Sequence, residues 1–315
     1  MRQLNAATPL RLPVQPAVEW PTLLLTLATY GAWLAVTKGY GRWSLAVLAP
    51  MGTLLLTLHG SLQHEMTHGH PTRWSLFNRL LAIVPLSLWL PYMRYRQSHL
   101  VHHRDERLTD PIDDPESYYL TPESAARLDP VSRWMLQLQL TLTGRVLLGP
   151  PWGITKFLGA EFRKARRGEA GLRAVWLEHL LWCIPVVYWV QQVCGMPLWI
   201  YVLTMVIPSA AVTLIRSYAE HRARPGVRAR IAIVERSWIL GPLFLFNNLH
   251  ALHHEMPSIP WYQYPARYRR ERARLIAENG GLVYNSYFEV ARRFLFRPHD
   301  TLQHPMGRVQ ARQAG

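Results

Sequence analysis

Four apolar stretches, arranged as two pairs, constrain the fold of this 315-residue chain more than any other feature of its sequence. They cover residues 20–36, 43–58, 175–193 and 198–215. Each is about 16–19 residues long, close to the roughly 17–25 apolar residues with which a helix crosses a bilayer. Because only short turns separate the members of each pair, we predict two helical hairpins. The expected fold is an all-α integral membrane protein with four transmembrane helices.

The polar remainder of the chain predicts the orientation of these hairpins. Two long regions, 60–174 and 216–315, carry most of the arginines, and the formal net charge is +15. Short positively charged segments tend to stay on the cytoplasmic side of a membrane. We therefore expect a cytoplasmic helical cap, with both termini and the active site in the cytoplasm of a bacterial inner membrane. Lys38 and Arg42 in the first turn oppose this orientation.

The positive charge also limits the partners. It favours anionic lipid headgroups or an acidic protein. The arginine-rich run at 267–274 raises nucleic-acid binding as an alternative. A basic helix face at the membrane surface or in solvent is the favoured interpretation, so we expect no nucleic-acid partner.

No internal repeat or low-complexity linker divides the sequence, so we expect one catalytic domain over residues 1–315. Between the hairpins, residues 133–162 are amphipathic and are expected to lie along the membrane surface. A Gly-Pro-Pro sequence at 149–151 should break that helix, because proline lacks the backbone N–H that a helix interior requires.

Histidines are concentrated in three short clusters, and a ninth histidine of interest, His221, follows the fourth apolar stretch. The clusters have HxxxH or HxxHH spacing and comprise His64 and His68; His99, His102 and His103; and His250, His253 and His254. Neutral imidazole is a common ligand for iron, copper, nickel and zinc. A mononuclear site takes three or four protein ligands, so nine histidines suit a centre with two metals.

The spacing within the clusters is that of helix faces. Residues i and i+4, or i and i+3, lie on one face of a helix. His64 and His68 should therefore project together. His99 and His102 should do the same, with His103 turned roughly 100° away. The third cluster repeats this pattern, so each HxxHH sequence can give two imidazoles to one metal and the third to its neighbour.

The first cluster also matches HExxH, the zinc-protease helix in which the glutamate is the general base. A zinc-dependent intramembrane metalloprotease and a non-enzymatic metal-storage or sensor protein are therefore alternatives. The protease leaves six clustered histidines unexplained, which disfavours it. In a two-metal centre we expect Glu65 to accept a hydrogen bond from an imidazole.

Several polar residues near the clusters have two interpretations. Asn247 and Asn248 either orient His250 and a metal-bound water or cap a helix. The acidic loop at 109–117 could bind a polar substrate, but a solvated turn supported by its prolines is favoured. Three further histidines are interpreted as solvated, namely His70, His299 and His304, although His70 could instead support a ligand of the first cluster.

The order of these features resembles the membrane fatty acid desaturase/hydroxylase superfamily. HxxxH after a hairpin, HxxHH about thirty residues later, and a second hairpin before another HxxHH extend over almost the whole chain. The sequence 247–254, followed by Pro257 and Trp261-Tyr262, is similar to a bacterial subgroup of that superfamily. The subgroup includes the rhizopine-catabolism oxygenase and the dihydrorhizobitoxine desaturase, which act on small polar molecules.

The resemblance implies that the nine histidines hold two iron ions. By position, one iron would take His64, His103, His221 and His250. The other would take His68, His99, His102, His253 and His254. In acyl-CoA members of the superfamily, an asparagine four residues before the isolated histidine helps to hold the first iron through water. Here that position is Ser217.

The resemblance also implies the reaction. Reduced iron and O₂ would remove hydrogen from an unactivated C–H bond, giving a double bond or a hydroxyl group. Membrane embedding favours a lipid acyl chain as substrate, whereas the bacterial subgroup favours a small polar metabolite. Electrons must come from outside, because the sequence has no cysteine cluster for iron–sulfur binding. An external ferredoxin with its reductase is the expected donor.

Overall fold

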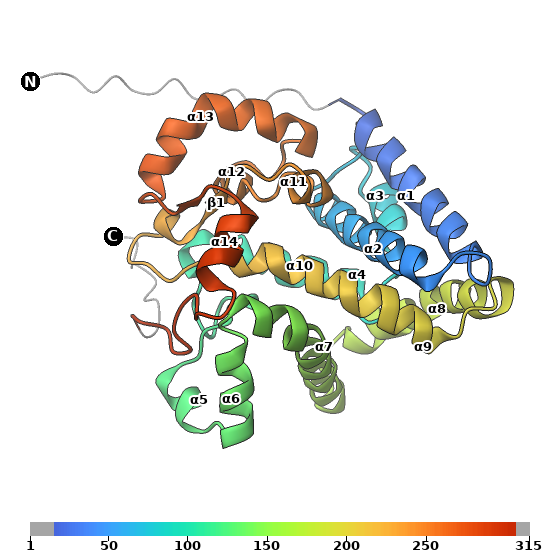
Figure 1. Cartoon of the computed structure of the whole chain (residues 1–315), viewed down its shortest axis with the longest axis horizontal. Helices are drawn as coiled ribbons and strands as arrows, with labels where there is room; N and C mark the ends of the chain where they lie inside the picture. Colours follow the sequence, from blue (N-terminus) through green and yellow to red (C-terminus); the bar gives the residue numbers. More distant parts are fainter. Residues whose placement is uncertain (1–15, 307–315) are drawn as a thin grey trace, which may run out of the picture.

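The computed structural model describes residues 16–306 and is built mainly from helices (Figure 1). The first half contains α1 (Trp20–Lys38), α2 (Leu45–Thr67), α3 (Ser75–Ala82), α4 (Tyr92–His102), α5 (Pro122–Ala126), α6 (Pro130–Leu138) and α7 (Leu142–Arg166). The second half contains α8 (Leu172–Tyr188), α9 (Leu198–Tyr201), α10 (Ile207–Glu220), α11 (Leu240–Leu243), α12 (His250–Glu255), α13 (Tyr264–Glu278) and α14 (Tyr287–Phe294).

Shorter elements complete the chain. The π-helical segment η2 (Trp189–Val193) extends α8, and η3 (Val202–Val206) joins α9 to α10, so residues 198–220 form one helical rod. Three 3₁₀ turns are η1 (Asp105–Arg107), η4 (Arg228–Arg230) and η5 (Trp261–Gln263). The strands β1 (Ile233–Val234) and β2 (Val283–Tyr284) pair in parallel and are a small departure from the expected all-α fold.

The two predicted hairpins form and pack against each other. α1 and α2 make the first, and α8 with the rod 198–220 makes the second (Figure 1). Their shared core includes Leu48, Val190 and Met205, which are all fully buried. Gly52 permits this packing, because a Cβ atom there would lie 2.8 Å from Cε of Met205 and closer still to the rest of that side chain.

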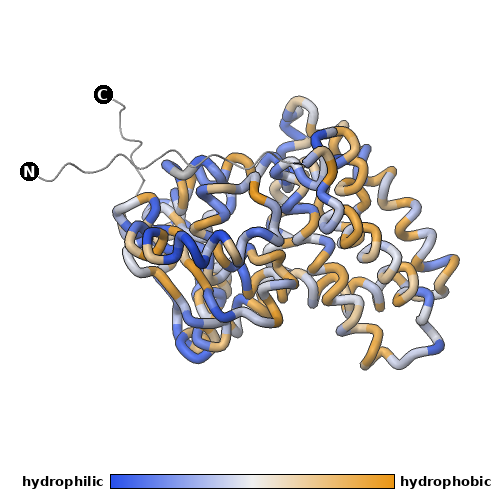
Figure 2. The backbone as a smooth tube through the Cα atoms, turned by 90° about the horizontal axis from the view of Figure 1, so that it is seen from above, coloured by the Kyte–Doolittle hydropathy of each residue, from blue (hydrophilic) through white to orange (hydrophobic). Residues whose placement is uncertain are grey.

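Two helices among residues 16–306 are long and apolar enough to cross a membrane, namely α2 and the rod 198–220. The other two predicted spans are also helical, in α1 and in α8 with η2, but do not meet that criterion. They nevertheless turn apolar side chains outward: Leu24 and Leu177 are both more than half exposed. Figure 2 shows apolar residues concentrated towards the end of the molecule that holds these hairpins.

The predicted break at 149–151 is wrong, because α7 runs unbroken through Pro150 and Pro151. The helix packs closely along α10 at this point. A Cβ atom at Gly149 would lie 2.6 Å from Cδ1 of Leu214, so the missing side chain allows the close approach. Contact with α10 therefore maintains a helix that the local sequence alone would interrupt.

A second hydrophobic core lies beyond the hairpins, between β1, α12 and α13. Its buried members include Ile233, Leu252 and Tyr264. This core packs α12, which carries the third histidine cluster, against α13 and β1.

Candidate metal centre

The structure brings all nine predicted histidines together in two adjoining groups. We call the first group cluster A; it comprises His64, His68, His99, His103 and His253. The second, cluster B, comprises His102, His221, His250 and His254. Within each cluster, one side-chain nitrogen from every residue lies within 4.8 Å of all the others. The histidines come from the ends of α2, α4 and α10 and from α12.

The distances between ring nitrogens are those expected around a cation. In cluster A, Nε2 of His99 lies 3.1 Å from Nε2 of His68 and 3.0 Å from Nε2 of His103. In cluster B, Nε2 of His221 lies 2.9 Å from Nε2 of His250 and 3.0 Å from Nε2 of His102. A ring nitrogen carries one proton or one lone pair, so it cannot satisfy two such neighbours by hydrogen bonding. One metal ion in each cluster would satisfy all of them.

The grouping of the histidines differs from the division that the resemblance implied. His64 and His103 lie in cluster A rather than with His221 and His250, while His102 and His254 lie in cluster B. Every i, i+4 pair stays together, and each i+3 histidine joins the other cluster. At about 100° per residue, i+4 lies about 40° around the helix and i+3 about 60°. The smaller angle decides which imidazoles converge.

Two carboxylates of the acidic loop hold the outer nitrogens of the second histidine group. Nδ1 of His99 lies 3.0 Å from Oε1 of Glu116, and Nδ1 of His102 lies 2.9 Å from Oδ1 of Asp114. The other Asp114 oxygen accepts from the backbone N–H of Thr109 at 2.9 Å. The favoured interpretation of 109–117 as a solvated turn is therefore wrong. An acidic loop directly after an HxxHH sequence was the available signal, because metal-binding histidines usually donate to a carboxylate.

The two carboxylates also determine the protonation of these imidazoles. Burial alone would lower the pKa of His102, but Glu116 and Asp114 outweigh it and raise that pKa to about 9. Burial opposes ionisation of Glu116, yet His102 and His99 keep the pKa of that carboxyl far below its ordinary range. Burial, with His99 next in importance, lowers the pKa of His103 to about 2. The ionised carboxylates keep the proton on Nδ1, and a metal that binds Nε2 of His102 would have to displace the second proton of that ring.

Asn247 and Tyr264 make the corresponding contacts with the third histidine group. Oδ1 of Asn247 lies 3.0 Å from Nδ1 of His250, and its Nδ2 lies 3.3 Å from Nε2 of His64. Asn247 therefore links a histidine of each cluster. The Tyr264 hydroxyl lies 3.1 Å from Nδ1 of His253, a contact that nothing in the local sequence indicated.

The other expected supporting residues do not contact the imidazoles in this way. Asn248 donates to the backbone oxygen of Val234 at 2.6 Å and so supports the fold. Oε1 of Glu65 lies 3.8 Å from Nδ1 of His64, beyond hydrogen-bonding distance, and its Oε2 accepts from the backbone N–H of Trp261. Ser217 lines a polar cavity of about 40 Å³ beside His221.

The three histidines predicted to be solvated are all buried, so that prediction is wrong. Nδ1 of His70 lies 2.7 Å from Oε1 of Glu19. Nε2 of His299 lies 2.9 Å from the hydroxyl of Tyr284, and His304 contacts Oγ1 of Thr109 at 3.2 Å. Most of these partners are distant in the sequence, which is why a local interpretation missed them.

A cavity of about 250 Å³ lies between α2, α7 and α10. The ring of Tyr95 forms part of its wall and stacks on His99, with ring centroids 5.7 Å apart. The wall is largely apolar, and the hydroxyls of Ser61 and Thr213 in it donate to backbone oxygens. Gly153 lines the cavity and is exposed, so the cavity reaches the outer face of α7.

Comparison with known proteins agrees with this geometry. Residues 41–288, which are most of the chain, match the family model described as fatty acid desaturase. The matched region runs from just before α2 into α14 and so contains both clusters. No curated protein is similar enough to the chain to count as a match.

Proposed function

The chain belongs to the fatty acid desaturase family, and from this premise we propose that it is an O₂-dependent di-iron enzyme that desaturates or hydroxylates a lipid acyl chain. Clusters A and B would each hold one iron ion through the nine histidines. The bound irons would supply the redox chemistry that activates O₂. The observation that carries the proposal is the apolar cavity whose wall residue Tyr95 stacks on His99 of cluster A.

The residues around the clusters would keep the imidazoles ready to bind metal. Glu116 and Asp114 hold Nδ1 of His99 and His102, so that Nε2 points towards the ion. Tyr264 can accept from Nδ1 of His253 while its own hydroxyl donates to a backbone oxygen at 3.3 Å. These contacts fix the ring orientations before a metal arrives.

An acyl chain suits the cavity better than a small polar metabolite. Leu56, Ile154 and Leu214 form part of its wall, and an apolar chain could enter from the bilayer beside Gly153. The one cationic side chain in the wall, Arg216, is paired with Oε1 of Glu220 at 3.1 Å. A small polar metabolite, as in the bacterial subgroup noted above, is the alternative substrate.

We further propose that all four hairpin helices cross a bacterial inner membrane. The outward-facing leucines of α1 and α8 support this, because they would otherwise be exposed to water. Both termini and the two clusters would then lie on the cytoplasmic side, within the helical cap. The electron donor would be a ferredoxin supplied by its reductase.

A zinc metalloprotease suits the site less well. Such an enzyme needs the glutamate of HExxH free to act as a base on metal-bound water. Here Oε2 of Glu65 accepts from the backbone N–H of Trp261, and His64 and His68 share their cluster with three further histidines.

The proposal can be tested in bacteria that express the chain with a ferredoxin and its reductase. Total fatty acids would be analysed by gas chromatography–mass spectrometry, with a His253→Ala variant as the control. We expect a new double bond or hydroxyl group that the variant does not produce. An unchanged fatty acid profile from iron-loaded, membrane-inserted protein would contradict the lipid substrate and favour the small polar metabolite.

A further inference from the structure

We propose that the surface formed by α13 and the loop 222–228 is the docking site for a small acidic one-electron carrier protein, which delivers electrons through His254. This inference rests on the proposed function. Desaturation of one C–C bond consumes O₂, two substrate hydrogens, two protons and two electrons, and it yields two water molecules. The two electrons must come from a partner, because the sequence has two cysteines and neither has an iron–sulfur spacing.

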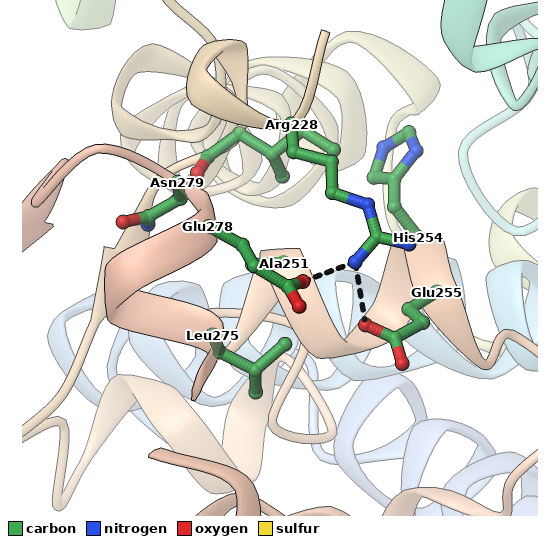
Figure 3. Close-up of a pocket in the computed structure, with 8 residues that line it drawn as sticks. Arg228, Ala251, His254, Glu255, Leu275, Glu278 and Asn279 are labelled. Atoms are coloured by element: carbon green, nitrogen blue, oxygen red, sulfur yellow. Dashed lines mark hydrogen bonds and ion pairs between the residues drawn. The ribbon is translucent and has the colours of Figure 1, made fainter. Parts of the chain in front are cut away.

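A small cavity connects this surface to the metal centre. It has a volume of about 40 Å³, and His254 forms part of its wall (Figure 3). The guanidinium of Arg228 lies over the cavity and pairs with both Glu278 and Glu255 (Figure 3). Arg274 pairs with the same two carboxylates, at 2.9 Å and 2.8 Å. The Arg228 side chain is 58% exposed, so one solvated cation separates the surrounding solution from a histidine of cluster B.

His254 contacts both metal clusters. Its Nε2 lies 3.2 Å from Nε2 of His250 in cluster B. Its ring stacks on His103 of cluster A, with centroids 4.3 Å apart and planes 16° from parallel. An electron that enters at His254 therefore has a short path to either metal.

The charge of the surface indicates the kind of partner. α13 carries five arginines and two glutamates, and the loop 222–228 carries three arginines. Three carboxylates from outside these segments, those of Glu235, Glu255 and Asp300, pair with some of these arginines, so positive charge remains in excess. Arg269 and Arg270 are exposed at the outer side of α13. Opposite charge steers a carrier to its docking site and speeds association, most strongly at low ionic strength.

The other small cavity that reaches cluster B would repel the same partner. It is lined by His221 together with three carboxylates, those of Asp114, Glu116 and Glu220. An acidic carrier would therefore avoid that side and bind at the arginine-rich surface over His254.

The test is stopped-flow reduction of the oxidised, iron-loaded full chain by a reduced acidic [2Fe–2S] ferredoxin at low ionic strength. The double variant Arg269→Glu/Arg270→Glu is compared with a control, Arg166→Glu/Arg167→Glu. The control removes the same charge from exposed arginines at the end of α7, away from α13 (Figure 1). The rate of reduction by dithionite, a small reductant, shows how readily each protein is reduced when no carrier protein has to dock.

We expect the α13 variant to react with ferredoxin roughly tenfold more slowly and with a weaker dependence on salt, while the control stays near the wild-type rate. Dithionite should reduce all three proteins at equal rates. If the two variants reacted with ferredoxin at equal rates, the proposed location of the docking site would be wrong. Failure of dithionite to reduce the iron-loaded wild-type chain would instead count against the proposed function.

Discussion

Glu116 is a side chain that lies close to both metal clusters without belonging to either. Its Oε1 lies 3.0 Å from Nδ1 of His99 in cluster A, and its Oε2 lies 3.9 Å from Nε2 of His102 in cluster B. Removing a carboxylate that orients a ligand typically lowers metal affinity about 10–100-fold. We expect that loss for Glu116→Ala, measured by competition with a chelator. Glu106→Ala, at an exposed position of the same segment, is the matched control, and equal affinities for the two variants would show that Glu116 does not orient the ligands.

The residue scale also shows what the sequence could predict about the site. The HxxxH and HxxHH spacings identified the set of histidines that converge. They could not divide the set correctly, because i+3 and i+4 both lie near position i on the helix surface, about 60° to one side and about 40° to the other. The partners of His102 and His70 were missed for another reason. Asp114 and Glu19 come from segments whose approach depends on the folded chain, 12 and 51 residues away.

At the scale of the elements, the contact between α2 and η3 depends on a glycine. A side chain at Gly52 would overlap with the side chain of Met205, which is fully buried. Overpacking of this kind typically costs about 1–3 kcal/mol. Gly52→Val should therefore lower the thermal unfolding midpoint in detergent. Gly31→Val is the control, since a Cβ atom there meets nothing within 4 Å; a similar midpoint for both variants would argue against close packing at Gly52.

A glycine of α7 provides a separate test of the substrate cavity. Gly153 lines that cavity, and a Cβ atom at this position would meet nothing within 4 Å. Gly153→Phe should fill the space, so that the enzyme either loses activity or modifies only shorter acyl chains. The iron content should stay at the wild-type level. The products are measured by mass spectrometry. Gly159→Phe, on the same helix but outside the cavity, should retain activity, and full activity of both variants would place the substrate elsewhere.

The elements also separate what local sequence determines from what packing determines. The apolar stretches predicted helices in α1, α2, α8 and the rod 198–220, because a long apolar segment satisfies its backbone best as a helix. The predicted break in α7 failed because the cost of two prolines is local. The stabilising contact of Gly149 with Leu214 depends on a helix 65 residues further along the chain, which the sequence around 149–151 cannot indicate.

At the scale of the whole molecule, hydropathy and charge are separated along the longest axis. Apolar segments dominate one end of Figure 2, and hydrophilic segments are more frequent towards the other. The arginines of α13 lie far from the hairpin turn that contains Arg42 (Figure 1). If the hairpins cross a membrane, the turn at Arg42 and the α13 surface must therefore lie on opposite sides of it.

This separation allows the orientation to be tested with two single cysteines. Cys183 and Cys194 are first replaced by serine, and Arg42→Cys or Arg269→Cys is then introduced at an exposed position. The positive-inside rule places the α13 side in the cytoplasm despite the two cations of the first turn. A membrane-impermeant maleimide should therefore label the Arg42→Cys chain in intact spheroplasts. It should label the Arg269→Cys chain only after lysis. The reverse pattern would show that the protein has the opposite orientation in the membrane. Labelling of both chains in intact spheroplasts would contradict a membrane-spanning arrangement of the hairpins.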